Sequence, residues 1–327
     1  MSAPRPGSRN GAGRASLSRR LLLAGAGAAL APAAGMAEAG RDAGTPVAKR
    51  ALRLAHLTDL HVMPELRAGL GLERCLTACQ AHGPDLILLG GDTVMDAFDA
   101  DRARVQAQWD LATRVLRANA GVPVEACLGN HDIWGWGDLA RFRHERGSGK
   151  RFALDALRLD KAYRSFDKAG WHFVILDSIH PVAGNGYTAR LDDAQFAWLE
   201  ADLAATPRDR PVLVMSHVPI LSACAYFDGD NESGGSWAVP GAWMHIDARR
   251  LKDLFRRHPN VRLCLSGHIH LLDRVEYLGV TYLCNGAVCG GWWKGPYQEC
   301  ANGFAIVDLF ADGSFTNAYH TYPWPPA

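Results

Sequence analysis

The chain has 327 residues, 48% of them hydrophobic and 21% charged, which is enough to bury the core of one large domain or of two small ones. Its 35 basic and 34 acidic residues nearly cancel. This balance excludes a global charge attraction to nucleic acid or to an anionic membrane, so any attraction for an anion must be local.

The first forty residues are a different kind of sequence from the rest. Five arginines precede the apolar stretch LLLAGAGAALAPAA, at Arg5, Arg9, Arg14, Arg19 and Arg20. The small-residue pattern Ala37-Glu38-Ala39 follows, which completes the basic, apolar and cleavage-site order of an export signal. The pair Arg19-Arg20 resembles a twin-arginine signal, with Leu22 and Ala24 where that motif favours Phe and Lys.

This interpretation divides the chain into an export signal at residues 1–39, a linker at 40–51 and one domain at 52–322. We expect the twin-arginine export machinery as a partner and a periplasmic or secreted location. The signal is either cleaved at Ala39 or kept as an anchor. Because its apolar stretch is too short to span a bilayer, we expect no transmembrane span in the mature protein.

From Leu52 onward, short apolar runs alternate with longer amphipathic ones. Near-continuous apolar runs predict strands covered on both faces, at 51–59, 85–92, 122–132, 171–177, 211–219 and 261–268. Between them, a helical period predicts helices at 72–81, 99–118, 192–204 and 247–258, the third capped by Asp192 or Asp193. Strands and helices in alternation predict an α/β layered fold.

Three stretches interrupt this alternation. Residues 134–158 and 226–243 are rich in Gly, Trp and charge, which predicts long loops or small caps between strands. Residues 274–322 alternate apolar and polar positions around glycines and an Asp312-Gly313 turn, which predicts β-structure.

Eight cysteines make an even number, which permits disulfides in an oxidising compartment. Cys75, Cys79, Cys127 and Cys264 lie in apolar runs or on a helix face, where small core residues are expected. A bridge is plausible only within the loop-rich cluster of Cys284, Cys289 and Cys300.

Metal-binding residue types follow five of the six predicted strands. The blocks are Asp59-Leu60-His61, Gly91-Asp92, Gly129-Asn130-His131-Asp132, Ser216-His217 and Gly267-His268-Ile269-His270. Any one of them alone is typical of an ordinary turn. Five in order at the same end of their strands predict one ligand-binding edge, because the carboxyl ends of strands in an open α/β sheet converge. The glycines let the backbone turn tightly there.

The ordered blocks closely resemble the calcineurin-like metallophosphoesterases, whose signature runs D-x-H, G-D, G-N-H-D/E, H and G-H-x-H. The resemblance implies a four-layer αββα sandwich with two central mixed β-sheets, a two-metal centre and hydrolysis of a phosphoester. Met95 stands where the related purple acid phosphatases place a Tyr, which points away from that branch.

Carried over by position, the resemblance assigns one metal ion to Asp59, His61 and His270, and the other to Asn130, His217 and His268, with Asp92 bridging both. Nitrogen and oxygen ligands without thiolate suit two divalent or trivalent ions of Mn, Fe, Zn or Ni, without choosing among them.

The same resemblance suggests how the reaction proceeds. Two ions can share one water and present it as a bridging hydroxide to the phosphorus. We expect His131 to face the scissile phosphate, where it protonates the leaving oxygen or stabilises the transition state. Asp132 is expected to orient the His131 ring and to favour its charged form.

Aromatic residues crowd the predicted loops and have two interpretations. Trp134 and Lys294 mark a stacking and cationic surface for an organic group on the phosphate, such as a nucleoside or a sugar, and the neighbouring Trp136, Trp237, Trp243, Trp292 and Trp293 belong to the same surface. Alternatively, these large rings pack loops that lack regular structure.

The sequence thus predicts an exported two-metal phosphoesterase that acts on a small-molecule phosphodiester or another small organic phosphate. A phosphomonoesterase acting on nucleotides or sugar phosphates is the alternative. A non-catalytic binding protein that retains the fold ranks lower, because no ligand and no catalytic histidine of the signature is missing. No specific binding of nucleic acid is expected.

Overall fold

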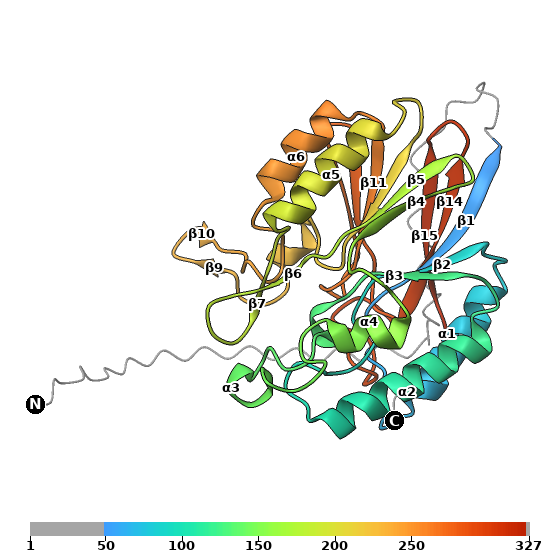
Figure 1. The fold of residues 1–327 in the computed structure, drawn as a ribbon. Helices are drawn as coiled ribbons and strands as arrows, with labels where there is room; N and C mark the ends of the chain where they lie inside the picture. Colours follow the sequence, from blue (N-terminus) through green and yellow to red (C-terminus); the bar gives the residue numbers. More distant parts are fainter. Residues whose placement is uncertain (1–48, 325–327) are drawn as a thin grey trace, which may run out of the picture. The chain divides into compact units, whose positions relative to one another are not determined.

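Two β-sheets form the centre of the fold in the computed structural model, which describes residues 49–324 (Figure 1). The first sheet has five strands in the order β15-β14-β1-β2-β3. In chain order these are β1 (Arg50–Leu57), β2 (Leu86–Leu89), β3 (Val124–Ala126), β14 (Gly303–Phe310) and β15 (Phe315–Thr321). The sheet is mixed, because β1, β2 and β3 pair in parallel and β14 pairs antiparallel with both β1 and β15.

The second sheet has six strands in the order β12-β13-β11-β8-β5-β4. In chain order these are β4 (Arg164–Lys168), β5 (Trp171–Ile175), β8 (Val212–Met215), β11 (Val261–Ser266), β12 (Asp273–Tyr277) and β13 (Val280–Cys284). The four central strands are parallel, and the two edge strands β4 and β12 are antiparallel to their neighbours.

Two helices cover the outer face of each sheet. Figure 1 shows α5 (Asp193–Ala205) and α6 (Ala248–Arg257) on one side of the sheets, with α1 (Ala68–Gln80) and α2 (Arg102–Asn119) on the other. Each helix pair shares a hydrophobic core with the sheet it covers, and a third core made of strand residues lies between the sheets. This arrangement confirms the αββα sandwich.

Strand β1 explains why the strands read as continuous apolar runs. Leu52 and Leu54 belong to the core between the sheets, whereas Ala55 and Leu57 pack with α1 and α2. Both faces of the strand are therefore buried, and polar alternation is absent. The inner core includes the stacked rings of Phe173 and the partly buried Phe166, whose centroids lie 4.9 Å apart.

The four predicted helices and six predicted strands are present, with shifted ends. Asp192 caps α5 as predicted, since its side chain accepts a hydrogen bond from the Gln195 amide at 2.7 Å. The C-terminal β-prediction is also confirmed, by β12 to β15.

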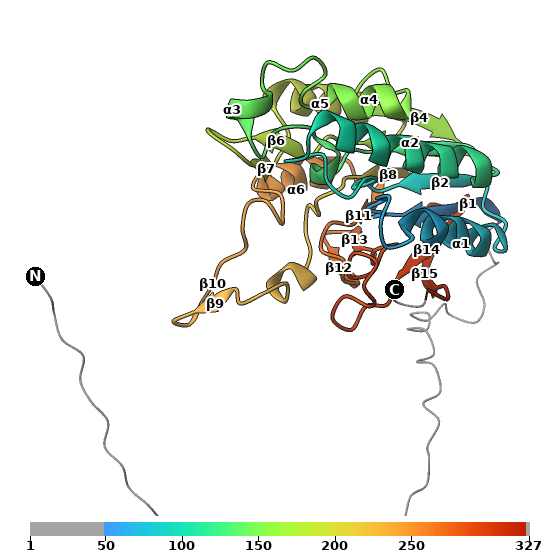
Figure 2. The same cartoon turned by 90° about the horizontal axis from the view of Figure 1, so that it is seen from below.

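The structure contains further elements in stretches predicted as loops or not assigned. Residues 134–158 contain α3 (Leu139–Phe142) and α4 (Arg151–Leu157), and residues 226–243 contain β9 (Glu232–Ser233) and β10 (Ser236–Trp237). In both views, β9 and β10 lie at the tip of a segment that extends away from the sheets (Figures 1 and 2). Strand β4 and the hairpin of β6 (Ile179–Pro181) and β7 (Tyr187–Ala189) were not predicted.

Three expectations concern the covalent state and the termini. All eight cysteines are buried free thiols, so the plausible bridge among Cys284, Cys289 and Cys300 is not formed. Within residues 49–324, no helix has the length and apolar character needed to cross a membrane. The predicted export signal at 1–39 lies outside the described residues, as does most of the linker.

Candidate metal centre

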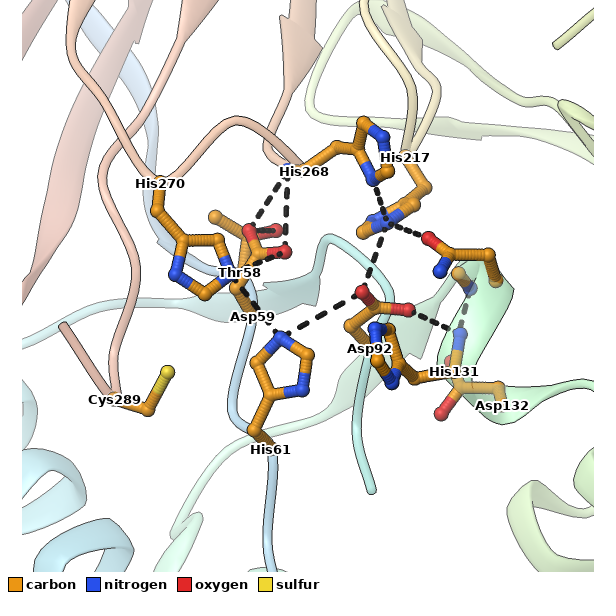
Figure 3. A network of polar contacts seen from close by, with 12 residues as sticks. Thr58, Asp59, His61, Asp92, His131, Asp132, His217, His268, His270 and Cys289 are labelled. Carbon is orange, nitrogen blue, oxygen red and sulfur yellow. Dashed lines mark hydrogen bonds and ion pairs between the residues drawn. The ribbon is translucent and has the colours of Figure 1, made fainter. Parts of the chain in front are cut away.

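The seven predicted metal ligands converge at the carboxyl ends of the strands, and Figure 3 labels all of them except Asn130, which lies against His217. The first sheet supplies four of them, in the loops that follow β1, β2 and β3: Asp59, His61, Asp92 and Asn130. The second sheet supplies three, after β8 and β11: His217, His268 and His270. All but His268 are buried, so the cluster lies at the junction of the two sheets and largely out of solvent.

One half of the cluster gathers around His270. Its Nε2 lies 3.1 Å from Nε2 of His61 and 3.5 Å from Oδ1 of Asp59. Oδ2 of Asp92 is 3.6 Å from Nε2 of His61. Asp59, His61 and His270 are the residues assigned to the first metal ion, and their donor atoms face one another.

The other half gathers around His217. Its Nε2 lies 3.1 Å from Nδ1 of His268, 3.3 Å from Oδ1 of Asn130 and 3.3 Å from Oδ2 of Asp92. The same Asp92 oxygen therefore lies close to both halves, as a bridging carboxylate would.

The electrostatics of the cluster favour positive charge on two of its four histidine ligands. Burial opposes a charge on His217, but the Asp92 carboxylate outweighs it and raises the pKa of His217 to about 9. Burial likewise opposes a charge on His270, where Asp59 outweighs it and raises the pKa. Burial lowers the pKa of His61 and that of His268 to about 3, so both stay neutral and accept hydrogen bonds.

Each half of the cluster thus favours one protonated histidine, His270 in the first and His217 in the second, whose Nε2–H would face acceptor atoms. The opposite ring nitrogen of each donates to a backbone carbonyl at 2.8 Å, of Gly290 and of Gly90, and so fixes the ring. Because a metal ion binds deprotonated imidazole, it would take the place of each hydrogen. The donor set therefore fits two cations.

The backbone at the ligands is strained. Five of the seven have positive φ angles between 44° and 73°: Asp59, His61, Asp92, His268 and His270. Each such residue costs of order 1–3 kcal/mol, and clusters of them occur at functional sites. Gly129 and Gly267 permit the close approach that brings the loops together, since a Cβ on Gly129 would lie 2.1 Å from Oδ1 of Asp92 and one on Gly267 would lie 1.9 Å from Oγ1 of Thr58.

His131 lies against the cluster, as predicted for the catalytic histidine. Its ring is 4.7 Å from that of His61 and nearly perpendicular to it, at 83°. Its backbone amide donates to Oδ1 of Asp92 at 2.8 Å, and its Nδ1 has no hydrogen-bond partner. The imidazole is therefore held beside the ligands with a nitrogen uncommitted.

The hydrogen bonds of Asp132 differ from those predicted. Its Oδ1 accepts hydrogen bonds from the amides of Thr93 at 2.8 Å and Val94 at 3.3 Å, and its Oδ2 accepts one from the amide of Gly129 at 2.9 Å. The side chain is fully buried. Asp132 therefore joins the loop after β2 to the loop after β3, and these contacts do not support its orienting the His131 ring.

The two predicted substrate residues are placed differently from each other. Trp134 is 0% exposed, its ring packs against Phe142 and Phe152, and its Nε1 donates to the carbonyl of Ala100 at 3.0 Å. The stacking role predicted for Trp134 is therefore wrong, because loop packing buries it. Lys294 is exposed.

Other residues beside the cluster carry no spacing signal in the sequence. Thr58 donates to Oδ2 of Asp59 at 2.7 Å, and Sγ of Cys289 lies within 4.8 Å of ring nitrogens of His61 and His270. The ring of Trp292 lies 4.8 Å from that of His270. The contacts of Cys289 and Trp292 join segments far apart in the chain.

Comparison with known proteins places this site in a family. A model described as calcineurin-like phosphoesterase matches residues 52–272, which include every ligand block. The 3',5'-cyclic adenosine monophosphate phosphodiesterase CpdA of Escherichia coli is 25% identical over 286 residues, covering 82% of this chain and 89% of that protein. A 3',5'-cyclic-nucleotide phosphodiesterase of a Nostoc species is 27% identical over 169 residues, 49% of this chain and 56% of that protein.

A solved structure supports the same fold. A dimetal phosphatase from Danio rerio superposes with a TM-score of 0.55 at 16% identity, over 84% of this chain and all of that one. This superposition shows a shared fold, and the family match over most of the chain establishes the relationship. The chain belongs to the calcineurin-like phosphoesterases, a family of metal-dependent hydrolases of phosphoesters.

Proposed function

We propose that this protein is an exported two-metal phosphodiesterase. The observation that carries the proposal is the convergence of seven nitrogen and oxygen ligands in two groups that both approach one oxygen of Asp92, with His131 beside them. When bound, a pair of metal ions supplies Lewis-acid charge to the phosphoryl oxygens and an activated water as nucleophile.

The two halves of the cluster define the two metal positions. Asp59, His61 and His270 would hold one ion, and Asn130, His217 and His268 the other, both sharing Asp92. Two divalent ions bring four positive charges against the two carboxylates, Asp59 and Asp92. The excess of positive charge favours binding of a phosphate anion.

His131 is the proposed general acid. Its ring is half-buried and lies beside that of His61, next to the position proposed for the phosphate group. Its imidazole would give a proton to the leaving oxygen as the ester bond breaks. Asp132 supports this step indirectly, by holding the loops of Asp92 and Asn130 together.

A diester substrate is favoured because two of the relatives are named as cyclic-nucleotide phosphodiesterases. Hydrolysis of a monoester of a nucleotide or sugar is the alternative. Export rests on a separate observation, the arginine pair and apolar stretch within residues 1–39, and implies passage through the twin-arginine machinery to the periplasm or the medium.

The test compares two model substrates that differ only in the number of ester bonds, bis-p-nitrophenyl phosphate and p-nitrophenyl phosphate. Protein loaded in turn with Mn, Fe or Zn should cleave the diester with the higher kcat/KM and lose that activity on chelation. The variant His131→Asn serves as a control for contaminating phosphatase. A higher kcat/KM for the monoester would contradict the diesterase proposal, and inactivity of every metal-loaded form on both would contradict hydrolysis.

A further inference from the structure

Two adjacent tryptophans in the loop after β13 have an unfavourable backbone conformation. Trp292 has a φ of 52° and Trp293 a φ of 67°, although this region favours glycine. Side chains retained at such angles are held there by their surroundings, often at functional sites. Each tryptophan therefore needs an interaction that offsets the strain.

Packing of its side chain offsets the backbone strain at Trp293. It is 0% exposed, its Nε1 donates to the carbonyl of His61 at 3.0 Å, and its ring lies 5.3 Å from that of Trp324. Helix α1 makes room for it with Gly71, where a Cβ would lie 2.1 Å from the Trp293 ring. Trp293 is thus an anchor that fixes the turn to the loop of a metal ligand.

Packing offsets less of the backbone strain at Trp292, because its side chain remains partly exposed. Its ring lies 4.8 Å from that of His270 at an interplanar angle of 35°, and 6.2 Å from that of His61. Tyr297 contacts it edge to face at 5.3 Å. Cys289, three residues before Trp292, lies on the His61 and His270 side of the cluster, as Figure 3 shows. Trp292 therefore presents an aromatic ring beside the proposed first metal position.

We propose that Trp292 stacks on the planar organic group of the substrate, the base of a nucleotide ester, while the phosphate lies at the metal ligands. The proposal rests on the proposed function, since it takes the phosphate site to be at the cluster. Stacking is sequence-tolerant, because every base offers a π-face. Trp292 would then select substrates carrying a planar ring over aliphatic phosphoesters.

Binding tests this without requiring turnover. The zinc-loaded protein is titrated with adenosine 5'-monophosphate and with ribose 5-phosphate, which share the phosphate and differ in the base. We expect the wild type to bind the nucleotide about 5- to 150-fold more tightly, the range that stacking of one base provides. Trp292→Gly, which accepts a positive φ without strain, should abolish that preference and leave the affinity for ribose 5-phosphate unchanged.

Two further variants separate stacking from general damage. Trp292→Phe keeps an aromatic ring and should keep most of the preference. Trp198→Ala removes a partly buried tryptophan from α5, where its ring packs against Tyr163 at 4.9 Å, and should leave the preference intact. An unchanged preference in Trp292→Gly, or an equal loss in Trp198→Ala, would overturn the proposal.

The same titration distinguishes this proposal from failure of the proposed function. If ribose 5-phosphate binds with metal dependence but the base adds nothing in the wild type, the phosphate site stands and stacking is refuted. If neither ligand shows metal-dependent binding, the phosphate site and the stacking proposal that depends on it are both refuted.

Discussion

Replacing Asp132 by asparagine perturbs the carboxylate that joins two ligand-bearing loops. The carboxylate accepts three backbone hydrogen bonds, at 2.8, 2.9 and 3.3 Å, in a fully buried position. Asparagine keeps one acceptor oxygen. In place of the second oxygen it has an amino group, which cannot accept a hydrogen bond from a backbone N–H. One buried backbone N–H then loses its acceptor, which costs about 1–3 kcal/mol of unfolding free energy.

The assay is denaturant unfolding of chelated protein, together with metal content after dialysis, for Asp132→Asn and His131→Asn side by side. We expect Asp132→Asn to lose stability by that amount and to bind metal more weakly, because the loops of Asp92 and Asn130 are no longer joined. Should Asp132→Asn keep wild-type stability and metal content while its turnover collapses, Asp132 would act on His131 after all and this reasoning would be refuted.

Three further changes test other parts of the account. His131→Asn should keep its metal content and lose about 10²–10⁴-fold in kcat, the contribution of a general acid, and a loss of metal would make His131 a ligand instead. Gly129→Ala should lower metal occupancy, measured by elemental analysis, because its Cβ would lie 2.1 Å from Oδ1 of Asp92. Burial opposes a charge on His172, but two neighbouring carboxylates, that of Asp202 first, raise its pKa above 6.5. The stabilising contribution of charged His172 is thus complete below about pH 6.5 and is lost as pH rises through the raised pKa. The free energies of unfolding of wild type and His172→Gln, measured against pH, should therefore converge at high pH. A constant difference between them at every pH would contradict this.

The convergence of the seven predicted ligands could be predicted from the sequence because each of them lies shortly after a strand. An apolar run fixes the strand, the sheet brings the strand ends together, and a glycine such as Gly129 lets the loops approach. Asp59 and His270, 211 positions apart in the chain, could thus be placed in one site without knowledge of side-chain packing. The resemblance supplied their division between two metal ions.

Roles that depend on packing between distant segments could not be predicted. The orienting role expected of Asp132 followed from its being next to His131, but the carboxylate turns toward amides of another loop. Trp134 follows the GNHD block directly, yet Phe142 and Phe152 enclose it. Neither contact leaves a period or a spacing in the sequence.

Edge elements escaped prediction for a related reason. Strand β4 reads RSFDK, which has one large apolar residue, because an edge strand is paired and buried on fewer sides than a central one. Its pairing with β5 is set by tertiary structure, including the stack of Phe166 on Phe173. A period of apolar residues detects only elements with a continuous buried face.

The central claim is that seven side chains hold two metal ions that share Asp92. It is tested most directly by elemental analysis of the wild type, Asp92→Ala and Asn130→Ala after equilibration with each of Mn, Fe and Zn. The account predicts about two ions per wild-type chain for at least one metal, about one for Asn130→Ala, and loss of both for Asp92→Ala. No more than one ion per wild-type chain with every metal, or full occupancy of Asp92→Ala, would contradict it.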